Sequence, residues 1–384
     1  MPNGHDNSAD TQRNPFDAWR RFTSSLDKAG AALEAATEHY SEDERGDAVR
    51  ALHRAVTNQL ARVEIDETSP EMLPFNGWRQ KFFMDNPDCG YFVAEIRDDA
   101  RYRITGTVSE SVFTSVTVYA GTALETTAVG RITSDEFDIA DDGTFAVTLG
   151  GDDADLDLPT GSDVVWVRHF HEAGALEAGR GTATIERLDR ADGRANGRAN
   201  GPASGPKPTP PGADLEAFAK RLRRSGRTVE LIAAAIGETE RHEAAFGFNT
   251  VRSWEQMSGG AVYTEPGISY VRGSWSLEEG EALVVDVAVP QCRHWSMLLY
   301  SRHLNSLDAR NRTVSLTGRT AAAGSDGGAR VIISAEDPGL GNHLDTEGRR
   351  FGVFVIRALQ PVAEPELPTT FVTTLDELRN EARP

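Results

Sequence analysis

Two stretches of the chain consist of short, closely spaced segments in which apolar and polar residues alternate. The first begins near Gly90 and the second near Ala261, and both are rich in Val, Ile, Thr and aromatic residues. Alternation with a period of two is typical of strands that bury one face. Turn residues separate the segments, and Asp142-Gly143 is the clearest hairpin signal. Because no helical segment lies between the strands, the pattern predicts antiparallel sandwiches and not a parallel α/β sheet.

Helical segments precede each of these stretches. In residues 16–64, apolar side chains recur at steps of three and four or their multiples, which predicts two amphipathic helices. Ser41 and Glu44 form a capping box at the start of the second helix. A short polar turn joins the two, so they predict a helical hairpin. The first apolar stripe consists of Phe16, Trp19, Phe22, Leu26 and Leu33, and the second of Val49, Leu52, Val56, Leu60 and Val63.

The joint between the two halves is a low-complexity segment. Residues 189–213 contain a tandem GRAN and then a Pro/Gly-rich run, which predicts a flexible linker. The predicted fold is mainly β with accessory helices, and its core is two antiparallel, jelly-roll-like β-sandwiches. The predicted domains are a disordered tail (1–15), the helical hairpin (16–64), a first β-sandwich (65–188), the linker (189–213), a helical connector (214–246), a second β-sandwich (247–365) and a C-terminal tail (366–384).

The balance of charge limits the partners of the chain. It has 40 Lys and Arg against 59 Asp and Glu, a formal net charge of −19 at pH 7. We therefore expect it to bind neither nucleic acid nor an anionic membrane face. We see no secretory leader and no apolar run that could span a membrane, which predicts a cytoplasmic location. Two cysteines, Cys89 and Cys292, are too few for a disulfide framework or a four-thiolate zinc site.

Signature motifs of several enzyme classes do not occur in the sequence. No Gly-Lys dipeptide is present, so there is no P-loop. The Gly-x-Ser-x-Gly motif of hydrolases and the H-E-x-x-H motif of zinc enzymes are missing too. Residues 339–344 begin like a dinucleotide-binding loop but lack its third glycine. The sequence therefore predicts no cofactor.

Two histidines on one predicted strand are candidate metal ligands. His169 and His171 flank a residue that points the other way, so they share one face of the strand, and Glu177 lies shortly beyond. Imidazoles at i and i+2 with a nearby carboxylate are how cupin jelly rolls hold a divalent metal. The glycine and His-to-Glu spacings differ from the cupin pattern. The prediction is therefore no metal, and the alternative interpretation is two solvent-facing histidines near a strand end.

Arg168 lies on the opposite face of the same predicted strand, in line with Val164, Trp166 and Phe170. An arginine among apolar residues needs a carboxylate or several carbonyls, because an unpaired buried charge is strongly unfavourable. Two roles stay open for it. One is a salt bridge between strand and loop, and the other is recognition of a ligand anion or carboxylate by the guanidinium group.

Two polar loop segments of the second half, 303–310 and 337–349, flank apolar strands. They hold more Asp, Asn, His and Arg than turns require, and long loops on a rigid sandwich are where sites usually form. An acid/base pair, if one exists, would combine one of the two aspartates with one of the two histidines. The candidate catalytic residues are thus Asp308, Asp345, His303 and His343.

The same loops supply the candidate ligand-binding residues. These are Asn305, Arg310 and Asn342, which Arg168 could join only if the two sandwiches pack face to face. The competing interpretation is that the aspartates of the loops merely pair with arginines and thereby fix the loops.

A set of short motifs in both halves resembles a known family. In the C-terminal half they are Gly273-Ser274-Trp275-Ser276-Leu277, Asn305-Ser306-Leu307-Asp308 with Arg310, and Asp337-Pro338-Gly339 with Gly341-Asn342 and Leu344-Asp345-Thr346. In the N-terminal half they are Asp85-Asn86-Pro87-Asp88, Tyr102-Arg103-Ile104 with Gly106, and Val167-Arg168. Together they resemble a bacterial domain of unknown function, the DUF-1214 type. The resemblance implies tandem jelly-roll-like β-sandwiches and no established activity.

The chain departs from the family pattern at two candidate positions. His343 stands where the family usually has Trp, and Asn305 replaces an acid that often precedes Ser-Leu-Asp. If that acid is catalytic in relatives, this chain lacks it.

Two functions from different classes fit these observations. The first is a small-molecule-binding protein or enzyme, with a polar pocket at the rim of the second sandwich or between the sandwiches. Its ligand would be a small organic molecule that is neutral, cationic or carboxylate-bearing. The second is a non-catalytic interaction or assembly module, and a homo-oligomer is compatible with either. A closed pocket with shifted pKa values would favour the first, and a flat apolar patch the second.

Overall fold

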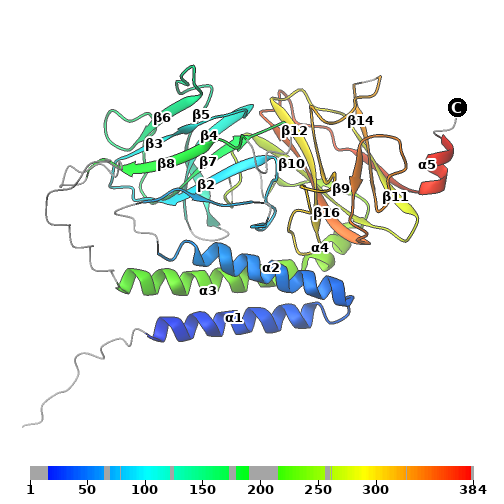
Figure 1. Ribbon diagram of the computed structural model, residues 1–384, viewed down its shortest axis with the longest axis horizontal. Helices are drawn as coiled ribbons and strands as arrows, with labels where there is room; N and C mark the ends of the chain where they lie inside the picture. The colour runs from blue at the N-terminus through cyan, green and yellow to red at the C-terminus, as the bar shows by residue number, and fades with distance from the viewer. Residues whose placement is uncertain are drawn as a thin grey trace, which may run out of the picture.

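The computed structural model contains two β-sandwiches and a layer of three long helices that runs along both of them (Figure 1). It confirms the predicted fold class, mainly β with accessory helices. The structure describes residues 16–64, 70–77, 79–121, 125–172, 179–189, 215–255, 260, 262–325 and 327–381. The predicted tail and, apart from its first residue, the predicted linker lie outside these ranges. Within them, no helix is long and apolar enough to cross a membrane.

The helical layer combines two helices that precede the first sandwich with one that follows the predicted linker. Its second helix begins at the predicted capping box, where the Ser41 hydroxyl accepts a hydrogen bond from the Glu44 amide. A short helix then leads from the layer into the second sandwich. The helices are α1 (Phe16–Ala36), α2 (Glu42–Leu60), α3 (Leu215–Gly237) and α4 (Thr239–Phe246).

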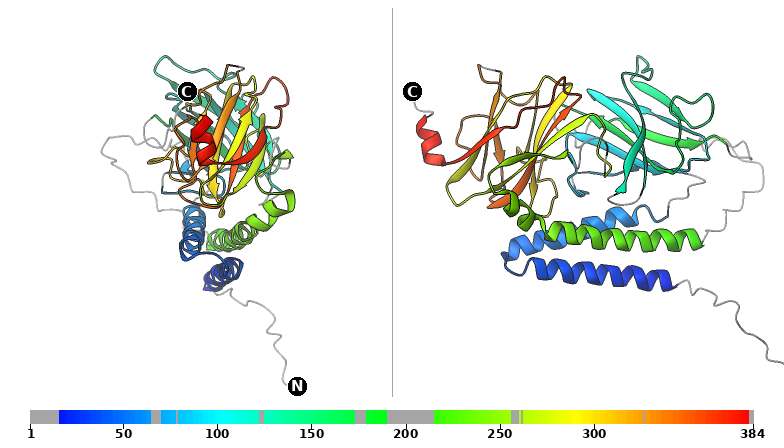
Figure 2. Two further views of the ribbon diagram at one scale, coloured as in Figure 1. Left: turned by 90° about the vertical axis from the view of Figure 1, so that its right-hand side faces the viewer. Right: turned by 180° about the vertical axis from the view of Figure 1, so that it is seen from behind.

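The helices α1 and α3 run parallel to each other. Gly226 of α3 lies against Ser25 of α1, and eleven residues further along both helices Gly237 lies against Ala36. A Cβ on Gly226 would lie 3.0 Å from the Cβ of Ser25, so the small residue permits the close approach. Seen end-on, α1 is the helix farthest from the sandwiches (Figure 2).

The apolar stripe predicted for α1 is only partly buried. Phe22 and Leu33 are buried, but Phe16 is 65% and Trp19 is 54% exposed. Six residues of an α-helix span about 600°, so Phe16 points about 120° away from Phe22. The inclusion of Phe16 and Trp19 in one buried stripe was therefore wrong.

The first sandwich packs a five-stranded sheet on a three-stranded one. The sheet orders are β1-β2-β7-β4-β5 and β6-β3-β8, and every pairing is antiparallel. Its strands are β1 (Leu73–Pro74), β2 (Cys89–Glu95), β3 (Tyr102–Thr107), β4 (Phe113–Ala120), β5 (Thr127–Thr133), β6 (Thr144–Leu149), β7 (Ser162–Phe170) and β8 (Thr182–Arg187).

The second sandwich packs a five-stranded sheet on a four-stranded one. The orders are β13-β12-β16-β10-β9 and β15-β14-β11-β17, and β14 pairs with β15 in parallel. Its strands are β9 (Val251–Ser253), β10 (Ile268–Ser276), β11 (Glu281–Val287), β12 (His294–Ser301), β13 (Ser315–Thr317), β14 (Ala329–Ser334), β15 (His343–Asp345), β16 (Phe351–Leu359) and β17 (Thr369–Thr374).

The C-terminal residues differ from the sequence-based interpretation, which placed 366–384 in a tail. Residues 369–374 form β17, which pairs antiparallel with β11, and α5 (Leu375–Glu381) follows. Leu375 and Leu378 of α5 bury themselves against Ala282 and Val284 of β11. The segment contains four threonines around one adjacent apolar pair, so it shows no alternation, but all six residues are β-branched or aromatic types that favour strands.

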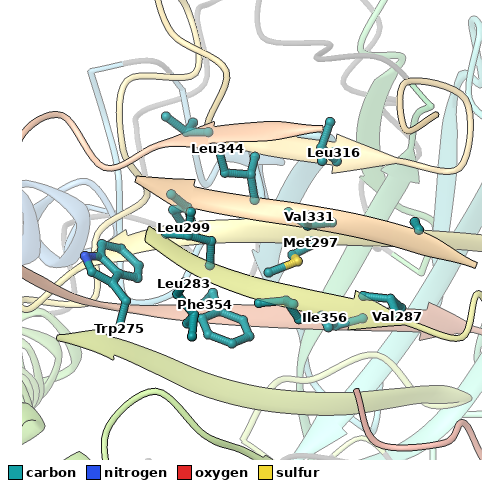
Figure 3. Close-up of a cluster of buried hydrophobic side chains, with 14 of the residues drawn as sticks. Trp275, Leu283, Val287, Met297, Leu299, Leu316, Val331, Leu344, Phe354 and Ile356 are labelled. Carbon is teal, nitrogen blue, oxygen red and sulfur yellow. The ribbon is translucent and has the colours of Figure 1, made fainter. Parts of the chain in front are cut away.

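Each sandwich has its own core, formed by alternate residues of its facing sheets. In the second sandwich, Trp275, Met297 and Phe354 point between the sheets toward Leu283 and other apolar side chains (Figure 3). A Cβ on Gly352 would lie 2.2 Å from the Trp275 ring, so only glycine leaves room for it.

A third core joins the two sandwiches to the helices. The outward-facing side chains of β7 and β12, among them Phe170 and Leu298, belong to one buried cluster with Ile236 of α3 and Leu33 of α1. The sandwiches therefore pack face to face through β7, and a segment around Met84 is enclosed between them.

Candidate functional site

The structure brings the two candidate aspartates to the same rim of the second sandwich. The amide of Asp308 donates to a carboxylate oxygen of Glu347, and the amide of Glu347 donates to Asp345 Oδ1, at 2.7 Å. Arg349 of the same loop pairs with Glu347 and, across the interface, with Asp47 of α2. We call Asp308, Asp345, Glu347 and Arg349 the rim cluster, and it touches the helical layer through the pair of Arg349 with Asp47.

Both aspartates already have internal partners. Asp308 accepts hydrogen bonds from the Asn311 side chain at 2.7 Å and from the Arg310 amide at 3.1 Å. The Asn311 hydrogen bond holds the pKa of Asp308 below its usual value. Asp345 pairs with Arg312 at 2.6 Å. These contacts are those of turn-forming carboxylates.

The two candidate histidines do not reach these carboxylates directly. His303 is buried, its Nε2 lies 3.1 Å from the carbonyl oxygen of Glu44, and burial lowers its pKa to about 4. His343 Nε2 lies 3.1 Å from the carbonyl oxygen of Ser334. No direct hydrogen bond links either imidazole to the aspartates, as an acid/base pair would need.

The predicted ligand-binding residues of the loops hold the fold together. Asn305 accepts a hydrogen bond from Arg54 of α2 at 2.9 Å. The Asn342 side chain bonds to both the amide and the carbonyl of Ala322, each at 2.7 Å. Arg310 is exposed, and its amide closes the Asp308 turn.

Sequence reasoning missed two buried ionisable residues beside the rim cluster. Lys81 donates to the carbonyl oxygens of Ser306, at 2.7 Å, and Leu307. Asp85 accepts a hydrogen bond from the Ser306 hydroxyl at 2.9 Å. Burial lowers the pKa of Lys81 and raises that of Asp85. A signal existed, because Asp85 and Ser306 belong to two of the motifs that carry the family resemblance.

We expect Asp345→Asn to lower the free energy of unfolding by about 1 kcal/mol, measured by urea denaturation. The change removes the charge that pairs with Arg312, a half-exposed partner, and weakens the bond to the Glu347 amide. Asp337→Asn, in a neighbouring turn without an arginine partner, is the control and should cost less. Unchanged stability of Asp345→Asn would contradict a structural role for this carboxylate.

Arg168 lies away from the rim, in the seam between the sandwiches. Its Nη1 is 3.1 Å from Glu265 Oε2, and the other oxygen of Glu265 lies 2.8 Å from Arg131 Nε. The Arg168 guanidinium also lies over the Trp166 ring, 4.7 Å from its centroid. Arg168 is therefore occupied by a salt bridge between the sandwiches and does not join the loop residues.

The two strand histidines are buried, contrary to the solvent-facing interpretation. His169 Nδ1 lies 2.8 Å from the Thr114 hydroxyl, and burial lowers its pKa to about 4. His171 is also buried, beside the backbone of Arg180 and of Glu110, and burial lowers its pKa too. Glu177 lies outside the described residues. Among those residues, no three His, Cys, Asp or Glu side chains are grouped as metal ligands would be.

A cavity that sequence reasoning did not predict lies between α1 and α3. It is an open groove of about 870 Å³. Its lining is unusual for a chain of net charge −19, because five cationic side chains and one carboxylate surround it. The lining residues are Arg20, Arg21, Ser24, Ser25, Lys28, Arg223, Arg227, Glu230, Leu231 and Ala234; we call this surface the helical groove.

Most of the cations in the helical groove lack a carboxylate partner. Arg20 pairs with Asp17 at 2.7 Å. Arg21, Lys28, Arg223 and Arg227 form no ion pair with any other described residue. The signal in the sequence was the run Lys220-Arg221-x-Arg223-Arg224-x-x-Arg227.

Comparisons with known proteins find a similar fold in an uncharacterized bacterial protein of known structure. No family model and no curated protein matches the chain. A solved structure of an uncharacterized protein from Burkholderia cenocepacia is similar, with a TM-score of 0.80 and 25% identity over 94% of this chain and 98% of that one. A solved protein from Vibrio parahaemolyticus matches 94% of this chain and 100% of its own, with a TM-score of 0.45 and 13% identity.

Proposed function

We propose that this chain is a non-catalytic binding protein, and that the helical groove binds an anionic partner. The observation that supports the proposal most is a set of four cations around one concavity, Arg21, Lys28, Arg223 and Arg227, none of which forms an ion pair within the described ranges. The chain as a whole carries 19 net negative charges, so a concentration of cations around one concavity is a local departure from its average charge. Guanidinium groups recognise carboxylate and phosphate groups through paired hydrogen bonds.

The rim cluster supports this proposal by its contacts. The carboxylates of Asp308 and Asp345 hold turns, and Lys81 and Asp85 fasten the segment before β2 to the 304–307 loop. A catalytic acid or base must be free to exchange a proton with a substrate, whereas these groups are held by hydrogen bonds and ion pairs within the protein.

A charge-reversal experiment tests the proposal. We expect Arg223→Glu combined with Arg227→Glu to weaken binding of a fluorescein-labelled deca-glutamate peptide at least tenfold in low salt, measured by fluorescence anisotropy. Arg103→Glu combined with Arg319→Glu is the matched control, because it changes the net charge equally at exposed positions on the sandwiches. Equal affinities of the two double variants would contradict the proposal.

A second proposal concerns a small-molecule or enzymatic site at the rim. It is favoured by one observation, the buried pair of Lys81 and Asp85, whose pKa values are both moved toward the neutral forms by burial. Such a site would need α2 to move away from the rim. A thermal-shift screen of metabolites against the wild type and Asp85→Asn would test it, with a hit lost in the variant expected.

Membership of the DUF-1214-type family, with its jelly-roll description, is also a proposal. It is supported by the contact between Asp85 and Ser306, because two motifs that lie 221 residues apart in the chain meet there. An alignment in which both residues vary together would support it further.

A further inference from the structure

We infer that the anionic partner is an acidic amphipathic helix, which lies along the helical groove as a fourth helix of the layer. The inference rests on the proposed function and specifies its partner. It begins from the two parallel helices α1 and α3, whose packed surfaces leave a groove running along their axes. Grooves between packed helices accept the side-chain ridges of a further helix.

The two helices contribute cationic and apolar side chains to the groove at different points. Leu231, 40% exposed, and Ala234 are the apolar residues of the lining, and Ser24 and Ser25 are small. Cations line the groove from both helices: Arg21 and Lys28 are seven residues apart on α1, and Arg223 and Arg227 are four apart on α3. Leu231 follows Arg227 by a further four residues, so it lies about one turn beyond the two arginines on the same side of α3. Seven residues of helix extend about 10 Å, so the α1 cations can follow two turns of a bound helix.

This distribution matches an amphipathic helix whose acidic residues follow the cations of both helices and whose apolar stripe reaches Leu231. The stripe would cover the exposed part of Leu231, and the carboxylates would face the guanidinium groups of Arg223 and Arg227 on α3 and the cations of α1. Glu230 also lines the groove and would disfavour an acidic side chain directly opposite it. The partner helix should therefore carry a neutral or basic residue at that point.

Nucleic acid and an anionic membrane fit the groove less well. Proteins that bind single strands stack bases on aromatic side chains, and the described lining contains none. Helices that bind membrane surfaces carry basic residues on one face and a row of aromatic or aliphatic residues on the other. Phe16 and Trp19 are exposed on α1, but neither lines the groove.

The test uses the full chain and four labelled probes. They are an 18-residue peptide of Glu and Leu with Leu at helical spacing, a scrambled peptide of the same composition, a 20-nucleotide oligo(dT), and vesicles containing phosphatidylserine. We expect the amphipathic peptide to bind at least tenfold more tightly than the scrambled peptide, with weaker binding of the other two probes. Leu231→Gln should weaken the amphipathic peptide about tenfold and leave the scrambled peptide unchanged, because only the former covers Leu231.

Val362→Gln, at a side chain that is 74% exposed on the second sandwich, is the matched control and should change neither affinity. Equal binding of both peptides, or tighter binding of oligo(dT) or vesicles, would overturn the helical partner and leave an anion-binding groove in place. If the double variant Arg223→Glu with Arg227→Glu weakens the binding of none of the probes, the proposed function is overturned as well.

Discussion

Replacing Glu265 with glutamine should lower the free energy of unfolding by about 3–5 kcal/mol, measured by urea denaturation. Glu265 is buried between the sandwiches, where it pairs with Arg168 and Arg131 and accepts hydrogen bonds from the hydroxyls of Ser115 and Thr117. Glutamine keeps the shape but removes the charge, so the buried Arg168 is left without a counter-ion. Loss of one partner from a buried pair is far more damaging than loss of an exposed one.

Two further variants separate charge from packing at this position. Asp286→Asn breaks the half-exposed pair with Arg330 and should cost at most about 1 kcal/mol. The double variant Arg168→Met with Glu265→Leu removes both buried charges and should be more stable than Glu265→Gln by about 2 kcal/mol or more. A loss for Glu265→Gln no larger than that of Asp286→Asn would show that the seam does not depend on this ion pair.

The sandwiches could be predicted because their signal is local. In β7, alternate residues point to two different cores: Val165 and Val167 to the inside of the first sandwich, and Trp166 and Phe170 to the seam. A period of two is visible in any window of six residues, whatever the rest of the chain does. The fold class followed from that pattern.

The partners of charged residues could not be predicted, because they lie far away in the sequence. Arg168 was known to need a counter-ion, but Glu265 is 97 residues further along the chain. Lys81 meets carbonyl groups 225 and 226 residues away. The residue type alone shows that a buried charged group needs a hydrogen-bond or ion-pair partner. Which residue becomes that partner depends on how the two sandwiches pack.

The candidate site was misjudged for a related reason. A loop with several Asp, Asn and His residues has the same composition whether it binds a ligand or fastens a helix. At the rim, Asn305 and His303 contact α2, which the sequence places more than 240 residues earlier. The helical groove was missed because total charge was considered for the whole chain, while Arg223 and Arg227 act locally.

Acid should destabilise the protein through two of its buried histidines, His169 and His303. Burial lowers the pKa of His169 and of His303 from 6.5 to about 4. The unfolded chain therefore binds more protons than the native state between pH 6.5 and 4, and stability rises with pH across this window. The contribution is complete above pH 6.5 and is lost as the pH falls toward 4, by about 3 kcal/mol for each histidine.

Asp88 opposes this dependence, so variants are needed to see each effect. Burial raises its pKa from 3.8 to about 6, which makes the native state more stable as the pH falls from 6 to 3.8.

Between pH 7.5 and pH 4.5, the free energy of unfolding of His303→Gln, measured with urea, should fall by about 2–3 kcal/mol less than that of the wild type. Over the same pH range, the free energy of unfolding of Asp88→Asn should fall by about 2 kcal/mol more than that of the wild type. The variant lacks the carboxyl group whose protonation stabilises the native state in acid. His53→Gln, at an exposed position of α2, should follow the wild type. If His303→Gln and His53→Gln show the same pH dependence, His303 is not held neutral in the native state.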